Sequence, residues 1–236
     1  MLPRSGGDLV TDLQTAVAKP DASLARGTAI HPHYRLRVHL RVCKIGQRFI
    51  FLDLAASRYF LLESEAAARF AAFREGSSDF RELDWLCGHG IIEPGVPAMS
   101  AELPIAAARS LIDEPLDRPA PWMVAEALAV QLVARRQVLR ASLMDILRPV
   151  PGRKDAKTCG PVVAACHIAA RYRSATDRCL PNAVAMRKML ARRGIASELV
   201  IGVMLPFAAH CWLQSGEVVL SDTFGRIQNF HPLAAA

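Results

Sequence analysis

The chain has 236 residues, of which 52% are hydrophobic and 22% are charged, a composition that excludes an intrinsically disordered protein. Its net charge of +7 is unevenly spread: residues 31–95 carry nine Lys/Arg against eight Asp/Glu, and residues 121–200 carry fourteen against five. A nucleic-acid binder concentrates basic residues on its recognition module, so the nearly balanced front part argues against nucleic acid as a partner.

The six cysteines are an even number, but the chain is too long and too apolar for a disulfide-stapled scaffold, and we expect free thiols. Residues 1–20 contain two aspartates and no apolar run, so they do not resemble a secretory signal. The longest apolar stretches are interrupted by polar residues before they reach the length of a membrane span. We therefore expect a soluble, cytoplasmic protein.

The front of the chain predicts a loose segment at 1–30 and a small domain at 31–95. Alternating and apolar runs predict a three-stranded antiparallel meander, and helical spacing predicts two helices after it. Residues 77–79 offer N-caps to the second helix. The expected elements are strands at 34–42, 49–52 and 59–62, and helices at 63–74 and 80–87.

Six prolines occur between residues 94 and 121, and this density predicts an interdomain linker at 96–120 with a short helix near 106–111. The domain at 121–236 then shows helical patterns followed by strand patterns, an order that is typical of the α+β class. Its longest predicted helix has one face formed by Leu128, Leu132, Leu139, Leu143 and Leu147. The expected elements are helices at 122–147, 160–173 and 179–193, and strands at 198–204, 210–214 and 217–222.

Cys179, His210 and Asp222 could supply, in chain order, the three parts of a thiol hydrolase: a nucleophile, a base and a carboxylate that orients the base. Pro181 is tolerated in a helix only in its first turn, so Cys179 should begin a helix. The amides and positive dipole end there, with Arg178 beside them, favour a thiolate and could stabilise an oxyanion. Taken singly, the thiol and the imidazole could each be structural.

A hairpin should connect His210 to Asp222, and its loop decides whether they meet. A three-residue loop centred on Gly216 would place them opposite each other, with Cβ atoms roughly 5 Å apart. A two-residue turn at 215–216 would instead pair His210 with Ser221 and direct Asp222 to the other face.

Other groups of cysteine and histidine residues do not indicate a functional site. Cys159, Cys166 and His167 do not assemble the ligands of a zinc site, and we expect no metal. The chain has no phosphate-binding loop, and we expect no cofactor.

Several motifs of the C-terminal part resemble the B protein of lasso peptide biosynthesis, a transglutaminase-like cysteine protease that removes leader peptides. They are RCLP at 178–181, LARRGI at 190–195, LVIGV at 199–203 and HCWL at 210–213, followed by Asp222. The resemblance implies a transglutaminase- or papain-like fold, with Cys179 as nucleophile, His210 as general base and Asp222 as its orienting partner. The chain departs from similar proteins at Cys211, Gln214 and residues 182–183, which leaves the triad residues in place.

The segments FIFLD at 49–53 and SRYFLLE at 57–63 are similar to the leader-recognition domain of peptide natural-product pathways, related to the small chaperone of pyrroloquinoline-quinone biosynthesis. That resemblance implies a winged-helix-like domain of meander and helices, which captures a leader as an added strand on the sheet edge. We expect Phe49 and Phe51 to be core residues. The expected leader contacts are Tyr59, Phe60, Leu61, Leu62, Phe80, Leu83 and Leu86.

Together the resemblances imply a fused leader-binding domain and cysteine peptidase that cuts the leader from a lasso precursor peptide. The freed amine of the core peptide would pass to an asparagine-synthetase-like macrocyclase. Two alternatives stay open: an acyltransferase that uses the same triad, and a non-catalytic leader chaperone. A winged-helix DNA regulator is disfavoured by the balanced charge of the front domain.

Overall fold

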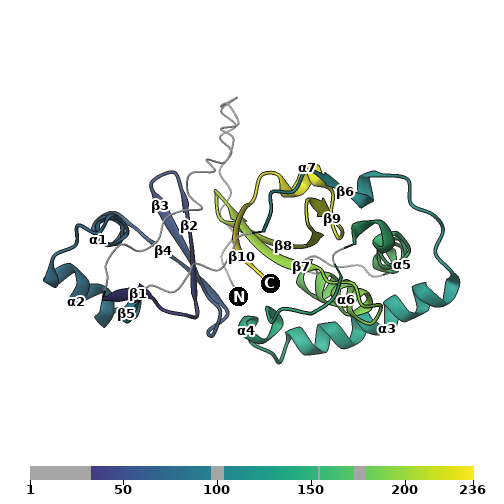
Figure 1. The fold of residues 1–236 in the computed structure, drawn as a ribbon, viewed down its shortest axis with the longest axis horizontal. Coiled ribbons are helices and arrows are strands. Elements are labelled where there is room, and N and C mark those ends of the chain that lie inside the picture. The colour runs from purple at the N-terminus through teal and green to yellow at the C-terminus, as the bar shows by residue number, and fades with distance from the viewer. Residues whose placement is uncertain (1–32, 97–103, 154, 173–178) are drawn as a thin grey trace, which may run out of the picture.

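The computed structural model describes residues 33–96, 104–153, 155–172 and 179–236. It has an α+β fold in which a small front domain and a larger C-terminal domain lie side by side (Figure 1). Within these described ranges, no helix has the length and apolarity needed to cross a membrane. The predictions for residues 1–30 and for Arg178 concern residues outside the described ranges.

The front domain contains the predicted antiparallel meander. It is formed by β2 (Leu40–Ile45), β3 (Arg48–Asp53) and β4 (Arg58–Leu62), with β3 in the centre. The prediction of one strand over 34–42 is wrong, because a turn in which the Leu40 N–H donates to the Arg37 carbonyl at 2.9 Å divides it. The first part, β1 (Tyr34–Leu36), pairs instead with β5 (Ile92–Pro94).

Two helices follow the meander, as predicted. Helix α1 (Ser64–Glu75) ends at Gly76, whose φ of +73° is the left-handed conformation common after a helix. Helix α2 (Phe80–Gly88) begins with a capping box, in which the Asp79 carboxylate accepts the Glu82 N–H and the Glu82 carboxylate accepts the Asp79 N–H.

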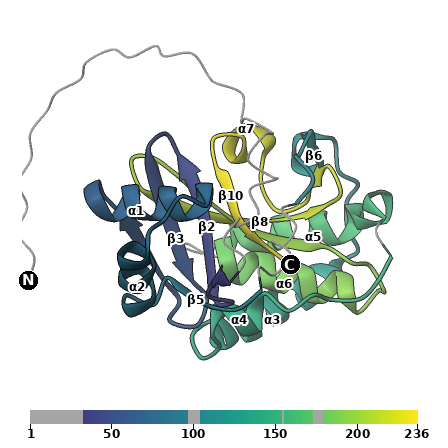
Figure 2. The same cartoon turned by 60° about the vertical axis from the view of Figure 1, so that its left-hand side comes forward.

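The front sheet is covered on both faces (Figure 2). Phe49 and Phe51 point toward the helices and pack edge-on against Phe70 of α1, so they are core residues, as predicted. Ile50 and Leu52, which alternate with them, join the core of the C-terminal domain. The meander therefore belongs to two cores at once.

The C-terminal domain packs helices against a five-stranded sheet of order β10-β7-β8-β9-β6. Its α-helices are α3 (Pro121–Val138), α4 (Leu143–Ile146), α5 (Gly160–Arg171), α6 (Cys179–Ala191) and α7 (Phe224–Ile227), and η3 (Ala156–Cys159) is a 3₁₀ turn. Its strands are β6 (Arg109–Ser110), β7 (Glu198–Met204), β8 (Ala208–Ser215), β9 (Val218–Val219) and β10 (His231–Ala235). Helix α6 and strand β7 follow the predicted ranges closely, whereas β10 was not predicted.

The long helix expected at 122–147 is two helices. Helix α3 ends at Val138, and Ser142 then caps α4 by accepting the Asp145 N–H at 3.2 Å. The predicted leucine face is also wrong, because Leu132 and Leu139 are 49% and 77% exposed. The buried face of α3 is formed instead by Met123, Ala127, Val130, Gln131 and Ala134.

Part of the range expected to be a linker belongs to the C-terminal sheet. Strand β6 pairs in parallel with β9, and the 3₁₀ turn η2 (Leu111–Asp113) follows it. The short helix predicted near 106–111 is therefore wrong: Ala108 donates its N–H to the Glu217 carbonyl at 2.8 Å, and the chain there is extended.

The β3–β4 turn of the front domain holds the start of α4. The Leu143 N–H donates to Ser57 Oγ at 3.2 Å, and the Met144 N–H donates to the Leu54 carbonyl at 3.2 Å. The first amides of a helix have no partner within it, so these bonds from another domain satisfy groups that α4 cannot satisfy itself.

Arg187 fixes the other end of α4 from within the core. Its side chain, in a residue 5% exposed, donates to the Ile146 carbonyl at 2.9 Å and to the Arg148 carbonyl at 2.8 Å. We expect Arg187→Ala to lower the free energy of unfolding by about 2–4 kcal/mol, because two carbonyls lose a charged donor. Urea denaturation measures this loss. The control is Arg192→Ala, at an exposed arginine directly after α6, which should lower the free energy of unfolding by less than about 1 kcal/mol. Equal losses would contradict the assignment.

Candidate active site

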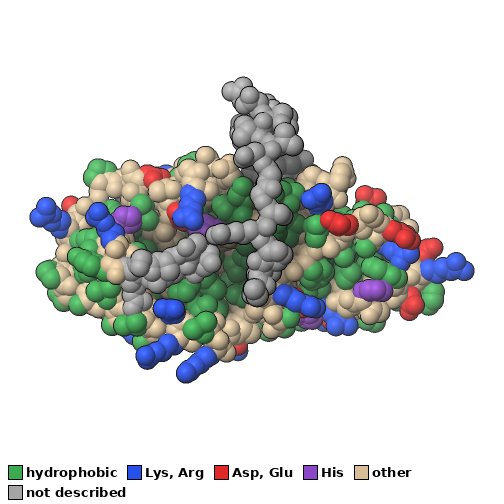
Figure 3. Space-filling view, turned by 180° about the vertical axis from the view of Figure 1, so that it is seen from behind, with side chains coloured by type: hydrophobic (Ala, Val, Ile, Leu, Met, Phe, Trp, Pro, Cys, Tyr) green, Lys and Arg blue, Asp and Glu red, His purple; other side chains and the backbone are tan. Residues whose placement is uncertain are grey.

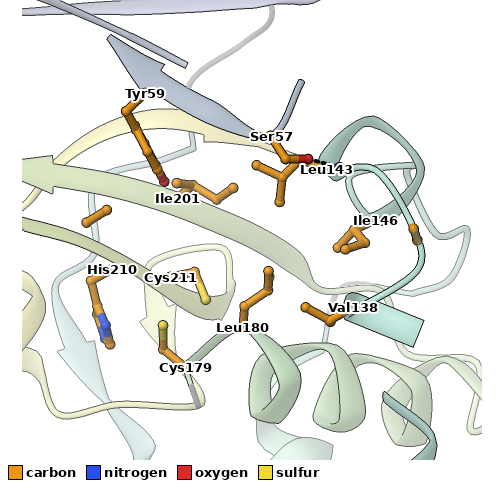
Figure 4. A pocket seen from close by; sticks show the side chains of 12 residues that line it. Ser57, Tyr59, Val138, Leu143, Ile146, Cys179, Leu180, Ile201, His210 and Cys211 are labelled. Atoms are coloured by element: carbon orange, nitrogen blue, oxygen red, sulfur yellow. Dashed lines mark hydrogen bonds between the residues drawn. The ribbon is translucent and has the colours of Figure 1, made fainter. Parts of the chain in front are cut away.

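Helix α6 is described over Cys179–Ala191, so Cys179 is its first described residue and lies two positions before Pro181. The helix is buried along most of its length and packs against α3 and β8. Cys179 itself is half-buried, and its sulfur lies beside His210 and Cys211 (Figure 4). The thiol thus lies at the end of the helix where unpaired amides favour an anion.

Strand β8 places His210 in the middle of the sheet. His210 is 6% exposed and lies opposite Gly202 of β7. A Cβ at Gly202 would come within 2.7 Å of the Trp212 ring and 3.1 Å of Phe230, so only glycine fits there. The His210 ring packs against Phe230, with ring centroids 5.3 Å apart. The position of the imidazole is therefore set by close packing.

The hairpin after β8 differs from both predicted turns. Ser215 pairs with Val218, which leaves a two-residue turn at Gly216 and Glu217. Gly216 has a φ of +58° at the first central position, where a type II′ turn favours glycine. Asp222 is consequently not the cross-strand partner of His210.

Asp222 reaches His210 from the bend after β9. The Leu213 N–H donates to Ser221 Oγ at 2.8 Å, so a side chain replaces a backbone ladder bond and the strand predicted at 217–222 ends early. Asp222 turns back from this bend, and its Oδ2 accepts a hydrogen bond from His210 Nε2 at 2.5 Å. The two residues meet, by a route that the hairpin argument did not predict.

The segment before α3 holds the Asp222 bend in place. Ser110 Oγ donates to the Asp222 carbonyl at 2.5 Å, and the Asp113 carboxylate accepts the Phe224 N–H at 2.9 Å. No local pattern predicts these contacts, because both residues lie more than 100 positions from their partners.

The electrostatics of the site favour a thiolate and an imidazolium. The Cys211 S–H, the His210 side chain and the Cys211 backbone N–H hydrogen-bond the Cys179 sulfur, and they outweigh burial to lower the pKa of Cys179 to about 4. Burial alone would lower the pKa of His210, but its bonds to Asp222 and Cys179 raise it to about 9. At neutral pH the proton therefore resides on His210.

The carboxylate of Asp222 is charged in this arrangement. Burial opposes its ionisation, but the hydrogen bonds from His210 and the Thr223 N–H, with Arg226 at 3.6 Å, lower its pKa overall. A thiolate, an imidazolium and a carboxylate in series have the charge pattern of a thiol-dependent acyl-transfer site.

A comparison with protein families matches residues 122–235 to the core of the transglutaminase-like superfamily. The C-terminal domain is a transglutaminase-like domain. This match is consistent with the fold of a cysteine peptidase or of an acyltransferase. No curated protein and no solved structure matches the chain.

Cys211 of the transglutaminase-like domain is the neighbour that sequence reasoning did not assign to the site. It is buried, and burial together with its bond to Cys179 raises its own pKa well above the ordinary value, so it stays a protonated donor. We expect Cys211→Ala to raise the pKa of Cys179, because the largest stabilising contact of the thiolate is lost. The pH dependence of iodoacetamide alkylation measures this pKa, and an unchanged pKa would contradict the assignment.

The pKa of Cys179 also sets it apart from three other buried or half-buried thiols. Burial raises the pKa of Cys43 and Cys166 to about 12 and that of Cys159 to about 11. Only thiolates react readily, so a brief treatment with iodoacetamide at pH 6 should label Cys179 ahead of these three residues. Peptide mass mapping identifies the labelled residue, and prior labelling of any of the three would contradict the prediction.

The residues expected to contact a leader are divided among three surroundings. Phe60 and Leu62 pack with the front-domain core, and Phe80 is 77% exposed. Leu83 and Leu86, at 5% and 0% exposure, are packed in that core and are not accessible to a ligand. Tyr59 and Leu61 lie on the opposite face and pack against the transglutaminase-like domain.

No group of three or more potential metal ligands occurs in the part of the chain that the structure describes. Figure 3 shows one face of the molecule, on which the acidic side chains lie mainly over the front domain and are interspersed with Lys and Arg. This face of the front domain carries charges of both signs.

Proposed function

We propose that the protein is a cysteine peptidase that binds the leader of a ribosomally made lasso precursor peptide and cleaves it from the core peptide. The observation that carries this proposal is the placement of Cys179 beside His210, which is hydrogen-bonded to Asp222, in a transglutaminase-like domain. The resemblance of its motifs to lasso B proteins gives the substrate class.

In the proposed reaction, the Cys179 thiolate attacks the carbonyl carbon of the scissile amide. His210, already protonated, donates its proton to the leaving amine, and a thioester remains on Cys179. Neutral His210 then accepts a proton from water, which attacks the thioester and releases the leader carboxylate. The Asp222 carboxylate keeps the imidazole oriented and stabilises its charge in both steps.

The front domain supports the leader-binding part of the proposal. Strand β4 lies at the edge of its sheet, and among the described residues no strand pairs with its outer side. An extended leader could add there as a fourth strand, which uses backbone hydrogen bonds and requires only a free edge. The same strand carries Tyr59 into the cavity beside Cys179, so a bound leader would lie near the site of cleavage.

Mass spectrometry of the reaction with the precursor peptide tests the proposal. We expect a leader with a free carboxylate and a core peptide with a free amine, which an asparagine-synthetase-like macrocyclase could then close into a ring. A new amide formed with an added amine would show an acyltransferase instead. An intact precursor that is nevertheless bound would show a leader chaperone.

A further inference from the structure

A cavity of about 320 Å³ opens beside Cys179 (Figure 4). Such a volume is within the range of ligand-binding pockets. Apart from Cys179 and His210 at one end, its lining contains no charged side chain. The rest is mainly aliphatic, and the principal contributors are Val138, Leu143, Ile146, Leu180 and Ile201.

The cavity extends away from the proton donor. Figure 4 shows His210 on one side of Cys179, and Leu180, Val138 and Ile146 on the other. The leaving amine must lie near His210, because His210 supplies its proton. The chain on the acyl side of the carbonyl is then directed toward the aliphatic end.

Both domains build the walls of this cavity. Tyr59 enters from β4 of the front domain, and its ring packs edge-on against Phe207, with centroids 5.4 Å apart. Ser57 of the same domain accepts the N–H of Leu143, a lining residue of α4. The front domain thus contributes one wall and positions another.

We propose that this interdomain cavity is a specificity pocket that binds one uncharged aliphatic side chain on the acyl side of the cleaved bond. This inference rests on the proposed function and names the residue class that the site accepts at the end of the leader. A charged side chain would lose its hydration with no ionic partner at the aliphatic end, so aspartate and lysine are excluded. Glycine would leave the aliphatic lining unfilled.

Peptidyl chloromethyl ketones test the pocket separately from peptide cleavage, because they need only the Cys179 thiolate. The probes are acetyl-X-Gly and acetyl-Gly-X chloromethyl ketones, in which X is leucine, glycine, aspartate or lysine. We expect leucine at one of the two positions to accelerate alkylation of Cys179 about 10- to 200-fold over aspartate and lysine. No preference for leucine at either position would overturn the proposal.

Filling the cavity should remove this preference without affecting the thiolate. Val138→Phe replaces an isopropyl group in the cavity lining with a larger aromatic ring. Val133→Phe makes the same change at an exposed site of the same helix. We expect only Val138→Phe to abolish the leucine preference, while iodoacetamide alkylates Cys179 at an unchanged rate in both variants. A preference that survives the filling would overturn the proposal.

Ala141→Phe fills the same cavity from the loop before α4 and replaces Val138→Phe if that variant does not fold, as judged by thermal unfolding. The outcomes also separate the pocket from the proposed function. A leucine preference without precursor cleavage would refute the peptidase and support the pocket. Cleavage of the precursor with no side-chain preference would refute the pocket alone.

Discussion

Replacing Cys179 with alanine is expected to abolish cleavage of the precursor, with a loss of at least about 10⁴-fold in rate. The substitution removes the nucleophile, and no other described thiol lies at a helix start with a lowered pKa. Leader affinity should be unchanged, because the free edge of β4 is in the other domain. Product mass spectra and fluorescence anisotropy of a labelled leader measure the two effects.

Cys43→Ala is the matched control. Cys43 is also half-buried, but it lies on β2 and does not line the cavity. This variant should cleave at a rate close to that of the natural protein. Undiminished cleavage by Cys179→Ala would end the peptidase assignment.

Asp222→Asn is expected to lower kcat/KM by about 10²- to 10⁴-fold and to change its pH dependence. In the natural protein, the rate should rise as Cys179 ionises near pH 4 and fall as His210 loses its proton near pH 9. Asparagine removes the negative charge that raises the pKa of His210. The alkaline limb should therefore move from about 9 toward 6.5, the ordinary value for histidine.

Asp117→Asn provides the control, because Asp117 is exposed and does not contact the site. Its pH profile should match that of the natural protein. A normal alkaline limb in Asp222→Asn would mean that the carboxylate does not act through His210, whatever the loss in rate.

Local signals predicted the elements that present the thiol and the imidazole. Pro181 restricted the start of α6, and the alternating pattern that begins at His210 indicated β8. These features depend on residues close together in the sequence, so they could be recognised without a fold. The same holds for α2, whose capping box is a local pattern.

Tertiary contacts decided the features that the sequence did not predict. The chain leaves the helical path between α3 and α4, where Ser57 and Leu54 of another domain bind the new helix start. The hairpin ends where Ser221 accepts a backbone bond from Leu213. Such interactions override helix and strand propensity, and no local sequence pattern predicts them.

The apolar run in the front domain contained more information about the fold than its strand prediction expressed. Residues 49–52 form a continuous apolar run, which is typical of a strand buried on both faces. That pattern indicated that the front domain packs against something besides its own helices. The structure identifies this neighbour as the C-terminal domain.

Strand β6 limits where the gene can be cut to express the C-terminal domain by itself. A fragment beginning at residue 121 would keep Cys179, His210 and Asp222 but would lose the parallel pairing with β9 and the Ser110 bond to the Asp222 carbonyl. It would also expose the apolar residues that now meet Ile50 and Leu52, which promotes aggregation. An inactive fragment of this kind would reveal a misplaced cut, and its failure would say nothing about the chemistry of the triad.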